Sequence, residues 1–230
     1  MHKQKENKPR KTKIAKDKAA QVVQILAEYY PDSKCSLNYN NAFQLLVATV
    51  LSAQTTDERV NKVTPELFNL FPTANDLSNA PSTVVENILK PIGFYKTKTD
   101  RIIKLASQIV QNYNNKVPNT MEELITLSGV GRKTANVVLG NIFSIPGLTI
   151  DTHIGRIARR LGWTKHKDPV KVEKDLAALL DPKIWTITCH RLIDHGRKIC
   201  TARKAHCEIC PLNQLCEAAF NIKKIDKAKL

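Results

Sequence analysis

Apolar residues recur every three to four positions along most of this 230-residue chain. Ala19, Val22 and Leu26 share this spacing, as do Ile102 and Leu105 further on. Such spacing places the apolar side chains on one face of an α-helix. Because no convincing pair of alternating strand patterns accompanies it, we predict an all-α fold. The other predicted helices span 42–53, 57–70, 83–90, 132–143, 152–161, 169–180 and 184–197.

Length and hydropathy narrow the class of protein. With 42% hydrophobic residues, the chain can bury a core in one large domain or two small ones. Its longest apolar run lies around 43–51 and is interrupted by Gln44 and Thr49, so it falls short of a membrane span. The lysine-rich N-terminus lacks the apolar region of a secretory signal. We therefore expect a soluble cytoplasmic protein without a membrane partner.

The charge balance is strongly basic, with a formal net charge of +15. Eight lysines and arginines stand against Glu6 and Asp17 in residues 1–18, and the rest of the chain still carries +9. We interpret residues 1–13 as a disordered basic arm. A basic folded body favours a polyanion such as nucleic acid, because phosphate contacts release condensed counterions. Simple solubility is the alternative explanation.

A glycine pair between two expected helices is the first candidate site. Thr120 and Glu123 stand at capping-box spacing and predict a short helix over 121–127. Gly129, Val130 and Gly131 follow, and a second helix is expected from residue 132. In a helix-hairpin-helix of this kind, glycines with positive φ expose N–H groups to a phosphate while the valine enters the core.

Other glycine loops fit less well. A dinucleotide-binding fingerprint needs a third glycine where Thr134 stands, and a preceding strand. A Walker loop needs four residues between its glycines, whereas Gly129 and Gly131 enclose one. An ordinary turn between two helices remains the structural alternative.

Lys133 falls in the first turn of the second expected helix. The positive helix end and the neighbouring Arg132 both disfavour an ammonium there, which favours a neutral, nucleophilic amine. A nucleophilic lysine also needs a nearby acid or base, and Asp151 follows eighteen residues later. Asp151 directly precedes a helical run, so a helix N-cap is its structural role. Capping and catalysis are compatible, because the cap fixes the position of the carboxylate.

Four of the six cysteines crowd into one short segment and predict a metal site. Cys200, Cys207, Cys210 and Cys216 are separated by six, two and five residues. Four thiolates bind either zinc or an iron–sulfur cluster, and their number alone does not distinguish the two. Arg203 and Lys204 lie in the enclosed loop and are candidates for a phosphate clamp. The isolated Cys35 and Cys189 are expected to be structural.

Taken together, these motifs resemble the endonuclease III family, bifunctional DNA glycosylases and AP lyases for oxidised pyrimidines. The resemblance runs from about residue 20 to residue 218. It rests on LSGVGRKTAN at 127–136, IDTH at 150–153, HGR at 195–197, LSAQTTD at 51–57 and the cysteine spacing.

The resemblance implies a two-domain helix-hairpin-helix fold with a DNA cleft between the domains. One would be a six-helix domain over 36–145 that contains the hairpin. The other would combine 14–35 with 146–230 and hold a structural [4Fe–4S] cluster on the four cysteines, Cys200, Cys207, Cys210 and Cys216. The implied partner is double-stranded DNA with damaged bases or abasic sites, bound by a monomer on nucleoid-associated DNA.

By position, Lys133 matches the family nucleophile and Asp151 the catalytic aspartate. Gln54 matches the residue that fills the gap in the duplex. Phe94 stands where a leucine wedge is common; this departure leaves the opposite-base preference open, although an aromatic wedge is physically sound. The remaining implied DNA contacts are Gly129, Val130, Gly131, Arg132, Arg203 and Lys204. His153 either touches DNA or packs inside the protein.

Three alternatives differ from this interpretation. An adenine-specific glycosylase of the same superfamily would need a glutamate where Thr49 stands and would lack a lysine at 133. A non-catalytic helix-hairpin-helix protein would only grip DNA, and the presence of both Lys133 and Asp151 argues against it. A four-cysteine zinc protein with an accidental hairpin is the third.

Overall fold

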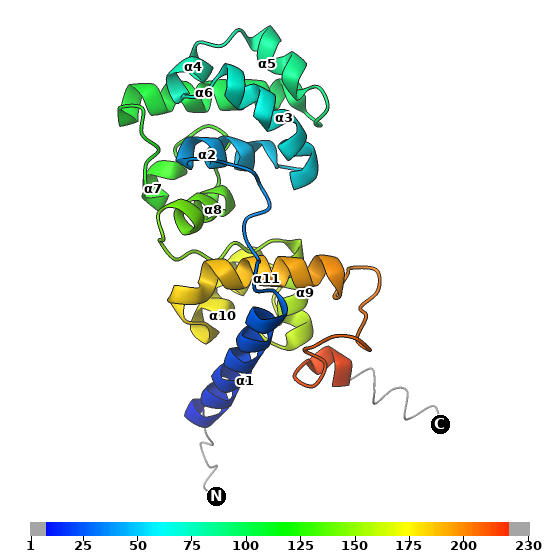
Figure 1. The fold of residues 1–230 in the computed structure, drawn as a ribbon. Helices are drawn as coiled ribbons and strands as arrows, with labels where there is room; N and C mark the ends of the chain where they lie inside the picture. The colour runs from blue at the N-terminus through cyan, green and yellow to red at the C-terminus, as the bar shows by residue number, and fades with distance from the viewer. Residues whose placement is uncertain (1–7, 221–230) are drawn as a thin grey trace, which may run out of the picture. The chain divides into compact units, whose positions relative to one another are not determined.

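The computed structural model describes residues 8–220, and no strand occurs within them. The predicted all-α fold is confirmed. Two compact units divide the chain: Cys35–Gly147, here called the hairpin unit, and Met1–Lys34 with Leu148–Leu230, here called the cysteine unit (Figure 1). The expected boundaries at 36 and 145 differ from these divisions by no more than two residues.

The hairpin unit is built around one helix that is buried on every side. Its helices are α2 (Ala42–Leu51), α3 (Asp57–Leu70), α4 (Ala74–Ser78), α5 (Ser82–Leu89), α6 (Tyr95–Tyr113), α7 (Met121–Leu124) and α8 (Arg132–Ile142). Helix α2 reads AFQLLVATVL, and nine of its ten residues are buried. A helix that is apolar all round belongs in a core, and α3, α6 and α8 pack against it.

Seven helical segments occupy this unit, where the family resemblance implied six. The additional segment is α4, whose five residues are too few to show a helical period. It begins with a capping box between Thr73 and Asp76, and it packs with α5 against α6. Fully buried leucines and isoleucines from most of these helices form one core. Each contributes roughly 1.5–3 kcal/mol by leaving water.

The cysteine unit has its own core between α1 (Lys8–Tyr29), α9 (Thr152–Leu161), α10 (Pro169–Leu179), the 3₁₀ turn η1 (Pro182–Ile184) and α11 (Trp185–Lys198). Helix α11 packs against α9 and α1. Because α1 begins at Lys8, residues 8–13 of the expected disordered arm are helical. Lysine and arginine favour helices, and a proline is tolerated in the first turn, so α1 extends to Lys8. Residues 1–7 lie outside the described residues.

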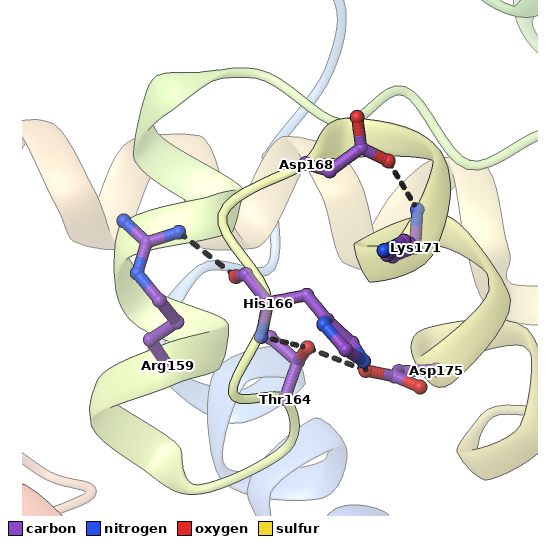
Figure 2. Close-up of polar contacts among 6 residues, drawn as sticks. All are labelled: Arg159, Thr164, His166, Asp168, Lys171 and Asp175. Atoms are coloured by element: carbon purple, nitrogen blue, oxygen red, sulfur yellow. Dashed lines mark hydrogen bonds and ion pairs between the residues drawn. The ribbon is translucent and has the colours of Figure 1, made fainter.

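A polar cluster fixes the connection between α9 and α10 (Figure 2). Gly162 ends α9 with a left-handed φ of +80°. The buried Thr164 hydroxyl donates to Asp175 and accepts the N–H of His166 at 3.1 Å. Asp168 then caps α10 by accepting the N–H of Lys171, the third residue of that helix, at 3.0 Å. These bonds hold α9, and therefore the residues at its start, in a defined position within the unit.

No helix in the part of the chain that the structure describes has the length and apolar composition needed to cross a membrane.

Candidate nucleic-acid interface and cysteine cavity

The hairpin begins with α7, which is shorter than expected. Thr120 caps it by accepting the N–H of Glu123 at 3.3 Å, but its hydroxyl donates to the Glu123 carboxylate at 2.7 Å. The predicted capping box therefore forms only in part, since that carboxylate does not reach the Thr120 N–H. Helix α7 ends at Leu124 rather than Leu127, because the next bonds run from i to i−3, including that from the Thr126 N–H.

The two hairpin glycines have different backbone conformations. Gly129 has a φ of +77°, and a Cβ there would lie 3.0 Å from a Val50 methyl and 3.3 Å from Arg101 Cδ. Gly131 is extended, with φ −105°, and has open space around it. The expectation of positive φ at both glycines is therefore wrong for Gly131, because a helix N-cap requires extended backbone. Val130 is buried between them, as predicted.

Lys133 is the second residue of α8 and is exposed, directly after the exposed Arg132. The N-cap of α8 is Gly131, so no side chain caps the N–H groups of the first turn. These groups carry the positive end of the helix dipole and form a site suited to an anion. The buried Ala135 and Val138 anchor the same helix in the core. The hairpin thus offers backbone donors and two cations at one helix end.

The two glycines allow a matched test of this hairpin. We expect Gly129→Ala to destabilise the protein by about 1–3 kcal/mol, because it forces alanine into left-handed backbone against Val50. Gly131→Ala should leave the melting temperature almost unchanged but weaken duplex binding, because a methyl group would stand where a phosphate approaches. Thermal denaturation and fluorescence anisotropy would measure both. Equal loss of stability in the two variants would contradict this description.

The structure brings Gln54 and Phe94 together in the hairpin unit, although forty residues separate them in sequence. Both are exposed and both have left-handed backbone, with φ of 55° and 59°. They line one cavity of about 240 Å³ with Ala53, Thr97, Lys98 and Arg101. Left-handed backbone at non-glycine residues is costly and concentrates at functional sites. Phe94 keeps 67% of its surface exposed, an unusual state for such an apolar ring.

Lys98 is a residue of this cavity that sequence reasoning missed. Only 3% of it is exposed, and its ammonium donates to the Thr55 hydroxyl at 2.6 Å. Burial lowers the pKa of Lys98, and the neighbouring Arg101 lowers it further. A lysine near a helix start is usually solvated, so its sequence context carried no signal of burial.

Asp151 belongs to the cysteine unit and is the N-cap of α9. Its Oδ1 accepts the N–H of Ile154 at 2.8 Å, which confirms the predicted capping role. The carboxylate is half-buried, and no hydrogen bond between described residues uses its Oδ2. Nearby, His153 Nδ1 lies 3.1 Å from Arg156 Nη2 and close to Gly196. His153 therefore packs within the unit, and its contact with DNA stays a prediction.

The four clustered cysteines line one cavity of about 250 Å³. Burial raises the pKa of Cys210 to about 11, and the charges of Cys200, Cys216 and Cys207 contribute to the shift. The four thiols are thus near enough to affect one another's ionisation. No group of three or more His, Cys, Asp or Glu side chains within residues 8–220 is arranged to hold a single metal ion.

Two arginines of α9 hold the start of the cysteine segment, and sequence reasoning missed both. Arg160 donates to Cys200 Sγ at 3.0 Å and to the Thr201 carbonyl at 2.9 Å. Arg156 donates to the carbonyls of Cys200 and Gly196. The sequence signal for this role was their spacing of four residues, which places both arginines on one face of α9. These bonds fix the position of the Cys200 sulfur and backbone relative to α9.

The predicted phosphate clamp lies on a tight turn next to this cavity. Arg203 and Lys204 are both exposed. The turn is closed by a bridge between Cys200 and Ala205 and by the Thr201 hydroxyl, which accepts the N–H of Lys204 at 3.2 Å. The cysteine cavity therefore fixes the backbone from which both cations extend.

A helical hairpin with an uncapped, basic helix start is a helix-hairpin-helix whose donors are suited to a phosphate backbone. The chain belongs to the HhH-GPD superfamily of base excision DNA repair proteins, whose family model matches residues 47–182.

Individual relatives agree over nearly the whole chain. Endonuclease III of Synechocystis sp. is 46% identical over 211 residues, covering 91% of this chain and 96% of the relative. Endonuclease III of Bacillus subtilis is 41% identical, covering 83% and 88%. The solved structure of a trapped endonuclease III–DNA covalent intermediate is 40% identical, with a TM-score of 0.85, covering 90% and 98%. A thermostable thymine-DNA glycosylase, 19% identical with a TM-score of 0.81, shares the fold.

Proposed function

We propose that this chain is a base-excision repair DNA glycosylase with AP lyase activity, acting as a monomer on cytoplasmic, nucleoid-associated DNA. It would remove oxidised pyrimidines from duplex DNA and then cleave the strand 3′ to the abasic site. The observation that carries the proposal is the exposed Lys133 at the uncapped start of α8, directly after the hairpin. The covalent DNA intermediate of the 40% identical endonuclease III supports it.

Base release begins with the hairpin. The N–H groups at the start of α8 bind a backbone phosphate and place the sugar near Lys133. The neutral amine forms a bond to the sugar C1′, and the glycosidic bond breaks. The electron pair of that bond leaves with the base, which takes up a proton. The amine of Lys133 attacks through its lone pair, so this step uses the neutral form.

Asp151 assists the same step as a general base or as a negative charge. It takes the proton that the amine loses, or it stabilises the cationic character that develops on the sugar. Its hydrogen bond to Ile154 fixes the carboxylate through Oδ1. The second oxygen is then available for chemistry.

Strand cleavage follows from the covalent intermediate. The sugar ring opens first: the C1′–O4′ bond breaks, O4′ takes up a proton, and the nitrogen of Lys133 forms a double bond to C1′. This protonated imine withdraws electrons and acidifies the proton on C2′. Removal of that proton forms a C2′–C3′ double bond and expels the 3′ phosphate, which is a β-elimination. Water then releases Lys133 by hydrolysis of the imine.

Gln54 and Phe94 maintain the duplex while the damaged nucleotide is out of the stack. Extruding a base costs a few kcal/mol, and an inserted side chain offsets part of the lost stacking. An aromatic ring on a base contributes about 1–3 kcal/mol. The exposed Phe94 ring and the Gln54 amide lie at one cavity and can enter the duplex together.

The proposal includes a [4Fe–4S] cluster on Cys200, Cys207, Cys210 and Cys216. Four cysteines that line one cavity match the ligand set of a [4Fe–4S] cluster. Four thiolates also bind a tetrahedral zinc ion, and metal analysis distinguishes the two. When bound, the cluster would supply structural cross-links and charge. Arg160 holds the Cys200 sulfur through a hydrogen bond, and the Arg203 turn is held for phosphate contact.

Cys207→Ser should remove the broad visible absorbance of an iron–sulfur cluster together with the bound iron. It should also lower the melting temperature, because the segment 200–216 loses its cross-link. Metal analysis and absorbance of anaerobically purified protein would measure this. Cys35→Ser, in the hairpin unit, is the matched control and should retain the iron. One bound zinc per wild-type chain, without iron, would establish the zinc alternative instead.

Borohydride trapping tests the whole proposal. Wild-type protein is mixed with a duplex bearing one thymine glycol, or one abasic site, and the imine is reduced. We expect a covalent protein–DNA band with both duplexes. If neither duplex gives a band, the lyase mechanism is wrong, and the chain is a DNA-binding protein or a monofunctional glycosylase.

A further inference from the structure

The cavity beside Gln54 and Phe94 has an unusual charge composition. Its six lining residues include two cations, Lys98 and Arg101, and no acidic side chain. The cavity lies next to Gln54 and Phe94, which have left-handed backbone and are the residues expected to enter the duplex. A positively charged cavity without its own counter-charge is suited to an anion.

Lys98 is the strongest sign of a ligand. It is 97% buried, and its single hydrogen bond among the described residues goes to the neutral hydroxyl of Thr55. An ammonium has three donors, and burying it without a carboxylate is costly. An anion in the cavity would accept a hydrogen bond from a second N–H of the Lys98 ammonium. It would also neutralise the positive charge of Lys98.

The start of α6 adds backbone donors at the same place. Its N-cap is Phe94, whose left-handed conformation and apolar ring provide no side-chain cap. Thr97, in the first turn, and Lys98 after it both line the cavity, so this helix start lies beside it. In a helix of nineteen residues, this end carries a partial positive charge that favours anions.

Arg101 connects the cavity with the hairpin. Its Cδ lies 3.3 Å from the position that a Cβ on Gly129 would occupy, so its stem packs against the hairpin backbone. The side chain is exposed and lines the cavity. Arg101 also disfavours the charge on Lys98, so the two cations repel each other in the free protein. A shared anion would convert this repulsion into attraction.

We infer that this cavity is a subsite for one phosphodiester of the DNA backbone, bound by Lys98, Arg101 and the first-turn N–H groups of α6. The inference rests on the proposed function and adds a second phosphate anchor to that of the Gly129–Gly131 hairpin. A phosphate bound in this subsite would hold the DNA strand in a fixed position relative to Gln54 and Phe94. The stem of Arg101 links the two anchors mechanically.

The test is a mutant cycle with neutralised phosphates. Duplexes carry a stable abasic analogue and one methylphosphonate, which removes one backbone charge, at successive positions near the lesion. Affinities are measured by anisotropy for wild type and Arg101→Gln. At one position the neutral linkage should weaken wild type about tenfold and Arg101→Gln less than about twofold. Arg101→Gln should also reduce the salt slope of binding by about 0.9.

Lys62→Gln is the charge-matched control, since exposed Lys62 is already paired with Glu58 at 2.8 Å and should leave the slope unchanged. Lys98→Met is measured too, but Arg101→Gln carries the test because its exposed side chain is not needed for folding. If every methylphosphonate affects Arg101→Gln as much as wild type, the subsite does not exist. Borohydride trapping by wild type reports separately on the proposed function, because it tests only whether the protein forms an imine with the DNA.

Discussion

Replacing Lys133 with glutamine is expected to abolish both base release and strand cleavage. The rate should fall on the order of 10⁴-fold or more, the scale on which enzymes respond to loss of a nucleophile. The reason is chemical, because without an amine no imine forms and the C2′ proton is not acidified. The covalent band in borohydride trapping should disappear on thymine glycol and abasic duplexes alike.

A loss of stability should not account for this result. Lys133 is exposed on α8, and surface substitutions of this kind change stability by roughly 0.5 kcal/mol or less. Lys133→Arg is the matched control, because it keeps the positive charge for phosphate but cannot form the imine under these conditions. It should bind duplex nearly as wild type and still give no covalent band. A band in either variant would assign the nucleophile to another residue.

The sequence predicted those helices best whose ends carry their own signals. Asp151, predicted as the N-cap of a helical run, caps α9 in the structure. Short elements were the exception, since α4 has too few residues to show a period and α7 stops where i to i−3 bonds replace the helical pattern. Both errors concern local hydrogen-bond geometry that hydrophobic spacing does not report.

The parts of the candidate site that depend on packing could not be predicted. The glycine motif indicated a phosphate-binding hairpin, but it did not show that only Gly129 takes positive φ. The shared cavity of Gln54 and Phe94 arises because α2 and α6 pack together across a long sequence interval. Burial of Lys98 follows from the same packing, and a lysine in a sequence gives no sign of it.

The cysteine segment also has one part that the sequence predicted and one part that only the folded structure shows. Its spacing predicted a metal site, because ligand types and intervals are written directly in the sequence. The support from Arg156 and Arg160 was not predicted, since charged residues on a helix are usually solvated. Only the folded unit shows that both arginines turn toward the Cys200 backbone.

Asp151→Asn is expected to slow base release by about 10²–10⁴-fold, the usual contribution of a general acid or base. Asparagine and aspartate are equally good N-caps, so the bond to the Ile154 N–H should survive. The melting temperature should therefore stay near that of wild type. Binding to a duplex with a stable abasic analogue should change little, or tighten slightly, because a negative charge near DNA is removed.

Asp168 provides the matched control, because it caps α10 in the same unit through an equivalent bond of 3.0 Å. Asp168→Asn should leave base release unchanged, which separates the chemistry of a carboxylate from the stability of a cap. If Asp151→Asn released base at the wild-type rate, capping would be the whole role of Asp151, and Lys133 would need another acid–base partner. If Asp151→Ala lost both rate and stability while Asp151→Asn lost only rate, the carboxylate would serve both roles, with Oδ1 holding the helix and Oδ2 available to the reaction.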